Sequence, residues 1–167
     1  MKEKLTRKDV EKIQEEIDHR KLVLRPQILD AVREARAQGD LSENFEYYAA
    51  RRENGTNNSR IRYLERMLKN AVIVEDHSSA DEVGLNKTVT VYIEEDDECE
   101  TYRIVTSIRG NSMKNLISIE SPLGKALLRH RVGDTVTIPV SDTYSYDVVI
   151  REIQDTDGEE DDSIRTF

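Results

Sequence analysis

The chain has 167 residues, of which 35% are charged and 37% hydrophobic, so any hydrophobic core must be small or localised. Its net charge of −9 argues against a free-standing DNA- or RNA-binding protein. A single cysteine, the lack of a signal-like opening segment and the lack of any apolar run near ~20 residues together predict a cytoplasmic protein without a membrane partner.

Residues 6–38 have the pattern of one long helix. Thr6 is a suitable N-cap, with an acid three residues later at the capping-box spacing. Apolar residues then recur at intervals of three and four. Pro26 lacks an N–H and crowds the preceding turn, which predicts a kink near Leu24–Arg25. Gly39 fits the end of the helix.

A second helix is predicted to begin after Asp40 or Ser42, with Ser42 as a good N-cap, and to run to about Ala71. Two helices of similar length joined by about four residues should form an antiparallel coiled-coil hairpin, with arms roughly 45 Å long. The predicted seam of the second arm alternates by four and three through Tyr47, Ala50, Asn54, Asn57, Ile61, Leu64 and Leu68.

The rest of the chain has a different period. Residues 75–87 are polar and acidic and read as a linker, after which apolar residues alternate as in strands. The predicted domains are a hairpin over 1–74, the linker, a small α+β domain over 88–154 with a mostly antiparallel sheet and one helix, and an acidic, disordered tail over 155–167. Strands are expected at Thr88–Ile93, Thr101–Ile108, Asn115–Glu120, Thr135–Val140 and Tyr146–Ile153, with the helix following the N-cap Ser121.

Charge differs between these parts. Residues 1–74 hold 16 of the 25 basic and 13 of the 34 acidic residues, which leaves 9 basic and 21 acidic residues for the remainder. The hairpin is therefore slightly basic and the second part strongly acidic.

Two carboxylates, Asp40 and Glu43, stand three residues apart at the predicted hairpin turn. They can simply complement the dipole and free N–H groups of the second helix. Alternatively, they can act as hard oxygen ligands at the end of a rod. Because Mg²⁺ needs six ligands, two carboxylates can only complete a site whose other ligands lie on a partner, as in two-metal phosphoryl chemistry.

Other polar and aromatic residues near the turn also allow two interpretations. The arginines of the two arms form either a solvated face or a basic stripe that guides a phosphate backbone. Phe45, Tyr47 and Tyr48 are interpreted as seam and staple residues rather than nucleobase stackers. The three histidines are scattered, and no residue set is placed for nucleophilic catalysis, so the chain does not look like a self-sufficient enzyme.

These residues resemble the Gre factors, GreA and GreB. Arg25-Pro26 and the segment VREARAQGDLSENFEYYAARRENG (Val32–Gly55) resemble the family's N-terminal signature, and NLISIESPLGKALLRHRVGDTV (Asn115–Val136) resembles its C-terminal domain. The resemblance implies a coiled-coil hairpin followed by an FKBP-like domain. It favours a GreA-type factor, because the arms near the turn lack a dense basic cluster.

The resemblance also implies a function. In the family, the C-terminal domain docks at the rim of the RNA polymerase secondary channel, and the hairpin tip helps to hold a Mg²⁺ ion in the polymerase active centre. The polymerase then hydrolyses the 3′ end of backtracked RNA. Asp40 and Glu43 match the two family acids. The resemblance implies that they assist the polymerase in trans, as ligands of a Mg²⁺ ion shared with it, and that the chain alone binds no metal. The expected channel or nucleic-acid contacts are Ser42, Asn44, Arg36, Arg51 and Arg52, and docking is expected around Ser118–Leu128. A monomer is expected.

The chain departs from the family at Thr56 and Asn57, where apolar residues are usual. Polar seam residues fix register at a cost in stability, so a looser or bent second arm is expected. This leaves open a channel-binding regulator that does not stimulate cleavage. A prolyl isomerase is the other alternative, but that activity needs an aromatic-lined pocket, and the chain has no Trp and only two Phe, Phe45 and Phe167.

Overall fold

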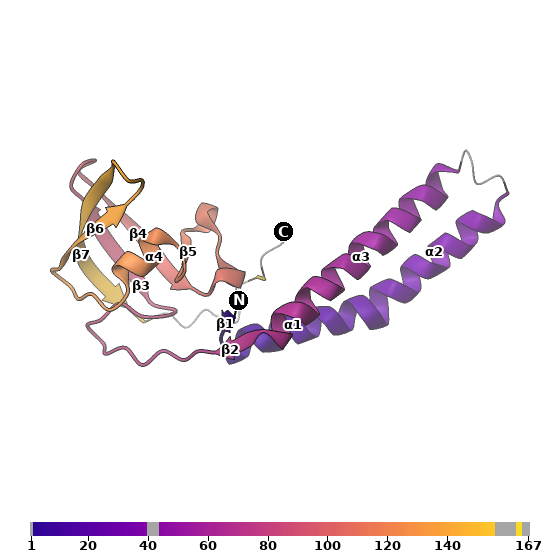
Figure 1. Ribbon diagram of the computed structural model, residues 1–167, viewed down its shortest axis with the longest axis horizontal. Coiled ribbons are helices and arrows are strands. Elements are labelled where there is room, and N and C mark those ends of the chain that lie inside the picture. Colours follow the sequence, from indigo (N-terminus) through magenta and orange to yellow (C-terminus); the bar gives the residue numbers. More distant parts are fainter. Residues whose placement is uncertain (1, 40–43, 156–162, 165–167) are drawn as a thin grey trace. The chain divides into compact units, whose positions relative to one another are not determined.

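The computed structural model describes residues 2–39, 44–155 and 163–164. Its contacts form two units, each described by itself (Figure 1). The first is built on Asp9–Val72 and the second on the chain from Ile73 onward together with Lys4–Lys8. The predicted domain bounds, 1–74 and 88–154, stay predictions. The described part of the chain contains no helix long and apolar enough to cross a membrane.

The first arm of the hairpin is helical throughout but not uniformly α-helical. It consists of α1 (Arg7–His19), a π-helical segment (Arg20–Leu24) and α2 (Arg25–Ala37). The predicted interruption before Pro26 therefore exists, and it takes the form of a widened turn. Pro26 has no N–H to offer the carbonyl four residues back, and a π-helical segment accommodates such a missing bond.

Backbone hydrogen bonds define both ends of α2. At its start, the N–H of Arg25 donates to the carbonyl of Arg20, five residues earlier. At its end, the N–H of Gln38 donates to the carbonyl of Ala35, and Gly39 follows with a φ of 110°. Only glycine adopts this backbone conformation without strain, so the predicted stop at Gly39 is confirmed.

The second arm is one unbroken α-helix, α3 (Phe45–Lys69), which packs along α2. Its N-cap is Asn44 rather than Ser42, and Ser42 lies outside the described residues. Five of the seven predicted seam positions are buried, and the other two, Asn54 and Leu68, are half-buried. The buried seam positions are Tyr47, Ala50, Asn57, Ile61 and Leu64. At the base, β1 (Glu3–Leu5) pairs with β2 (Ala71–Ile73) in a two-stranded sheet.

The second unit is a five-stranded sheet in the order β5-β4-β3-β7-β6, with one short helix, α4 (Pro122–Leu127). All neighbouring strands are antiparallel except β4 and β5, which are parallel. The strands are β3 (Thr88–Ile93), β4 (Glu98–Val105), β5 (Leu116–Ser118), β6 (Thr135–Pro139) and β7 (Ser145–Gln154). The predicted class, a helical hairpin followed by a small, mainly antiparallel sheet domain with one helix, is confirmed.

The strand that differs most from its prediction is β4. The strand β4 begins three residues before the predicted Thr101 and ends at Val105, and Ser107–Arg109 forms a 3₁₀ turn. Its exposed first residues lack apolar alternation, but they pair with the end of β3, where Tyr92 lies opposite Cys99. Ladder hydrogen bonds therefore extend this strand beyond what side-chain patterning indicates.

The core of the second unit lies between α4 and one face of the sheet. It contains Leu127 of α4 and the inward residues of the strands, including Val89, Ile104 and Ile150, all fully buried. The expected linker, 75–87, also contributes, since Val83 is fully buried in the same core. The linker residue Lys87 is buried as well, and its Nζ donates to the carbonyls of Ser79 and Glu82.

Candidate functional site

Asn44 closes the hairpin on the described side of the turn. Its Oδ1 accepts a hydrogen bond from the N–H of Tyr47 at 3.0 Å, which caps α3. Its Nδ2 donates to the carbonyl of Ala35 in α2 at 2.6 Å. One side chain therefore ties the end of one arm to the start of the other. Asn44, predicted as a channel or nucleic-acid contact, uses both ends of its amide within the hairpin.

The predicted metal ligands are not placed by this geometry. Asp40 and Glu43, like Ser42, lie outside the described residues. In the sequence they occupy the connection between Gly39 and Asn44, both of which are described. The described arms therefore end on either side of the acids, and the metal role of Asp40 and Glu43 stays a prediction.

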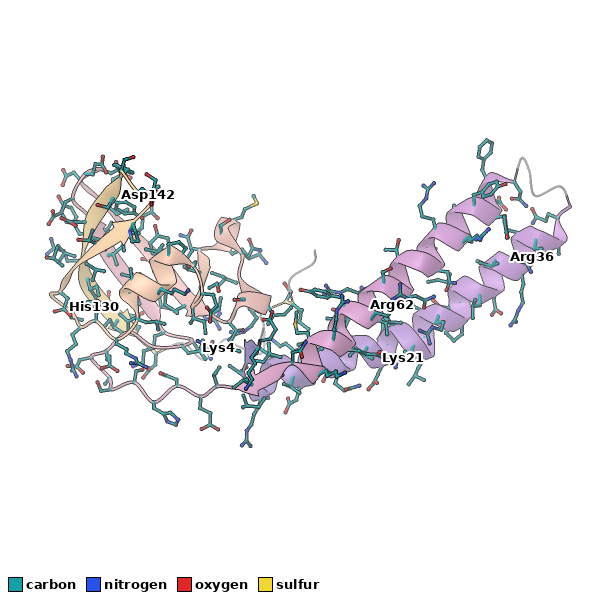
Figure 2. The ribbon with its side chains drawn as sticks, in the orientation of Figure 1. Lys4, Lys21, Arg36, Arg62, His130 and Asp142 are labelled. Carbon is teal, nitrogen blue, oxygen red and sulfur yellow. The ribbon has the colours of Figure 1, made fainter. Side chains whose placement is uncertain are left out.

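Arg36 bridges the arms close to this connection (Figure 2). Its Nη2 lies 3.4 Å from the hydroxyl of Tyr47, and its guanidinium carbon lies 5.7 Å from the centre of the Tyr47 ring. The hydrogen bond from Arg36 lowers the pKa of Tyr47 below its usual value. This predicted contact residue thus has a partner within the hairpin, while its own side chain remains exposed.

The other two predicted contact arginines, Arg51 and Arg52, are exposed on α3. Arg51 also helps to lower the pKa of Tyr47. Together with Arg36 they place three positive charges within about two helical turns of the start of α3 or the end of α2. Such charges suit contact with phosphate or with an acidic surface.

The arms also share a buried polar cluster that sequence patterning missed. Arg60, on α3, is only 5% exposed. Its Nε and Nη2 donate to the carboxylate of Glu16 on α1 at 2.8 and 3.2 Å. The same carboxylate accepts from Nε of Arg20 at 2.8 Å. Burial raises the pKa of Glu16, but the hydrogen bonds and charges of the two arginines outweigh burial and leave the pKa below its usual value.

Asn57 extends this cluster to the π-helical segment. Its Oδ1 accepts from Nη1 of Arg20 at 3.0 Å, and its Nδ2 donates to the carbonyl of Arg20 at 3.1 Å. Next to it, Oδ1 of Asn58 accepts from the guanidinium of Arg25 at 3.1 and 3.3 Å. The charged and amide residues opposite Pro26 therefore hold the two arms in register at the interrupted turn.

The predicted docking segment, Ser118–Leu128, borders a groove of about 640 Å³ in the second unit. Ser121 caps α4 by accepting from the N–H of Gly124 at 3.0 Å, and its hydroxyl donates to the carbonyl of Ser118 at 2.7 Å. The predicted cap is thus confirmed. Apolar residues line the groove together with several serines, Asn111 and Glu120, and Tyr146 is the one aromatic residue among them. This composition lacks the aromatic lining on which an isomerase pocket depends.

Candidate metal ligands elsewhere do not converge. Within the described ranges, no group of three or more His, Cys, Asp or Glu side chains is placed to hold a metal ion. His130 lies 3.3 Å from a carboxylate oxygen of Asp134, and Cys99 is an exposed free thiol. Asp40 and Glu43 fall outside the residues searched.

Comparisons with known proteins match both units. The family described as "Transcription elongation factor, N-terminal" matches residues 3–73, and "Transcription elongation factor, GreA/GreB, C-term" matches residues 77–155. Transcription elongation factor GreA of Macrococcus caseolyticus is 41% identical over 149 residues, 89% of this chain and 94% of the relative. The GreA of Thermoanaerobacter pseudethanolicus is 45% identical over 137 residues, 81% of this chain and 87% of the relative.

Among solved structures, GreA factor homolog 1 of Thermus thermophilus matches with 26% identity and a TM-score of 0.43, covering 92% of this chain and 99% of that one. Membership therefore rests on the two family matches and on the sequence relatives. The chain belongs to the GreA/GreB family of transcription elongation factors.

Proposed function

We propose that the chain inserts its hairpin into the secondary channel of RNA polymerase and stimulates the polymerase's own cleavage of backtracked RNA. The observation that carries the proposal is the pair of arms joined across Asn44, because they hold the ends of an acidic four-residue connection at the end of a narrow rod. Family membership supports the partner, and the relatives' name supports a role in elongation.

Asp40 and Glu43 are the residues proposed to act on the reaction. Two carboxylates can supply only a minority of the six oxygen ligands that Mg²⁺ requires, so the rest must come from the polymerase. A Mg²⁺ ion held there supplies an activated water and charge neutralisation at the phosphate. On its own, the chain is proposed to be neither a nuclease nor a Mg²⁺-binding protein, and to act as a cytoplasmic monomer.

Transcript cleavage in a stalled, backtracked polymerase complex tests this role. Asp40→Asn and Glu43→Gln keep the side-chain shape and remove one charge each, so both are expected to abolish stimulated cleavage while polymerase binding persists. Glu46→Gln is the matched control, because Glu46 is an exposed acid in the first turn of α3. If all three variants lose activity equally, general helix-end electrostatics explain the effect and the ligand role is wrong.

The same assay separates cleavage from channel binding alone. A pure channel-binding regulator would compete for the polymerase but leave the RNA length unchanged. The polar seam was the reason to consider such a regulator, but Asn57 makes two hydrogen bonds across the arms. The polar seam residue Asn57 therefore gives no structural reason to favour a regulator that does not stimulate cleavage.

We place the docking contact on the second unit, along the groove beside α4. Apolar and polar residues both line the groove, and Lys125 is exposed, with its Nζ 3.7 Å from a carboxylate oxygen of the lining residue Glu120. Lys125→Glu is expected to weaken polymerase binding measured by competition, whereas Lys69→Glu, on the exposed end of α3, serves as a charge control. Unchanged affinity for the Lys125→Glu variant would remove this surface as the contact.

A further inference from the structure

Phe45 is a large aromatic side chain that the fold leaves in solvent. It is 86% exposed, and among the described large hydrophobic residues only Met113, at 96%, is more exposed. The interpretation of Phe45 and Tyr48 as seam residues is wrong, because only Tyr47 of the three aromatic residues is buried. An aromatic ring in water keeps its apolar surface available for a partner outside the chain.

The backbone that carries Phe45 is held firmly. Phe45 is the first residue of α3, directly after the cap Asn44. The side chain of Asn44 bonds both the first turn of α3 and the end of α2. The exposed ring is therefore presented from an anchored helix start, which reduces the ordering needed when it binds.

Phe45, Tyr48 and Arg52 share one face of α3. Their spacing of three and then four residues places them in a row, on the side of the helix opposite the seam residues Tyr47 and Ala50. All three are exposed, with Tyr48 at 45%. Arg52 lies about 10 Å along the helix from Phe45. The face therefore combines an aromatic platform with a cation, the combination that binds single-stranded nucleic acid.

We propose that Phe45 stacks on a nucleobase of the displaced 3′ segment of backtracked RNA, with Arg52 facing the phosphate backbone of the same segment. The inference rests on the proposed function, because only that function brings RNA to this end of the hairpin. The sequence supports the occupant: Phe45 follows Glu43 by two residues, which keeps their Cα atoms within about 7 Å of each other, so RNA engaged by the acids comes close to the start of α3. A stacking contact accepts any base, since each has an aromatic face.

Cleavage assays with two RNA substrates test the contact. Backtracked complexes are assembled with a displaced 3′ segment that carries either ordinary nucleotides or abasic nucleotides. Phe45→Ala is expected to lower stimulated cleavage of the ordinary RNA by about tenfold, the size of one aromatic–base stack, and to leave cleavage of the abasic RNA unchanged. Phe45→Trp keeps an aromatic ring and is expected to stimulate cleavage of the ordinary RNA as well as the unaltered chain does.

Leu22→Ala is the matched control, because Leu22 is 74% exposed on the first arm, far along the chain from the acids. It should not distinguish the two substrates. Equal loss with both RNAs for Phe45→Ala would mean that Phe45 contacts polymerase rather than RNA, and no loss with either would mean that it contacts neither. Both results overturn the inference.

The outcome for the unaltered chain separates this inference from the proposed function. If the unaltered chain leaves the RNA intact, the proposed function fails and the stacking inference fails with it. If it stimulates cleavage and Phe45→Ala matches it on ordinary RNA, only the stacking inference fails.

Discussion

Replacing Glu16 by Gln tests whether the buried polar cluster holds the hairpin together. The variant keeps the shape of the side chain but removes the carboxylate charge that pairs with Arg60, which is 5% exposed. Removing one partner of a buried ion pair costs about 3–5 kcal/mol. The side chain of Glu16 is 23% exposed and Gln can still accept one hydrogen bond, so the lower end, about 3 kcal/mol, is expected.

Urea unfolding followed by far-ultraviolet circular dichroism measures this loss. Helix signal reports mainly on the hairpin, because α4, with six residues, is the one α-helix described in the second unit. With a dependence of about 2 kcal/mol per molar urea, the midpoint should fall by about 1.5 M. Glu15→Gln removes the same charge from an exposed neighbour and should change stability by less than about 0.5 kcal/mol. Coinciding midpoints for the two variants would refute the reasoning.

A double replacement asks whether the pair contributes stability or only specificity. Glu16→Met combined with Arg60→Met removes both charges and fills similar volume. Because apolar replacements of buried ion pairs are often neutral or stabilising, the double variant should be more stable than Glu16→Gln alone. Arg20 then loses its carboxylate, but its side chain is 26% exposed and can turn to water.

Three further predictions concern separate parts of the chain. The pKa of Glu16 is lower in the folded chain than its usual 4.5, so the stability that the Glu16 carboxylate contributes is complete above that value and is lost as the pH falls through the lowered pKa. The urea midpoint should therefore fall in that acidic range, and Glu16→Gln should remove this part of the pH dependence. Asn44→Ala should destabilise the start of α3 by about 1–2 kcal/mol and speed amide exchange in its first turn, and unchanged exchange would show that the cap contributes nothing. Gly124→Ala would push a Cβ against the carbonyl of Ser118, so the second unit should melt earlier while the hairpin's helix signal persists; equal melting would contradict the tight approach.

The seam of α3 was predictable because apolar spacing directly encodes which side of a helix is buried. Tyr47, Ala50, Ile61 and Leu64 follow the four-three pattern and are buried. Arg60 was missed because a charged residue beside an apolar one is ordinarily solvated. Its burial depends on a carboxylate 44 residues earlier on the other arm, a pairing that local periodicity does not contain.

At the turn, the position of the helix cap decided what the aromatic residues do. A hydrophobic staple joins the residue before the N-cap to the fourth helical residue. With the cap at Ser42, Phe45 would be the third residue of the helix, whereas with the cap at Asn44 it is the first. Neither position belongs to a staple, and the seam spacing already selected Tyr47. The exposure of Phe45 thus follows from the helix start and the seam register taken together.

Asn57, a polar residue in the seam of the second arm, bonds the irregular π-helical segment of the first arm. A polar residue at this seam position predicts a looser or bent second arm, yet α3 is unbroken and the first arm carries the π-helical segment. Pro26 lacks the N–H that a regular helical turn would use there, and Asn57 donates to the carbonyl of Arg20, the residue at which the widened turn begins. An apolar side chain could fill the space but could not bond that carbonyl. The departure from the family's usual apolar residue therefore fits the local backbone of the opposite arm, which is why it cannot be judged from the second arm alone.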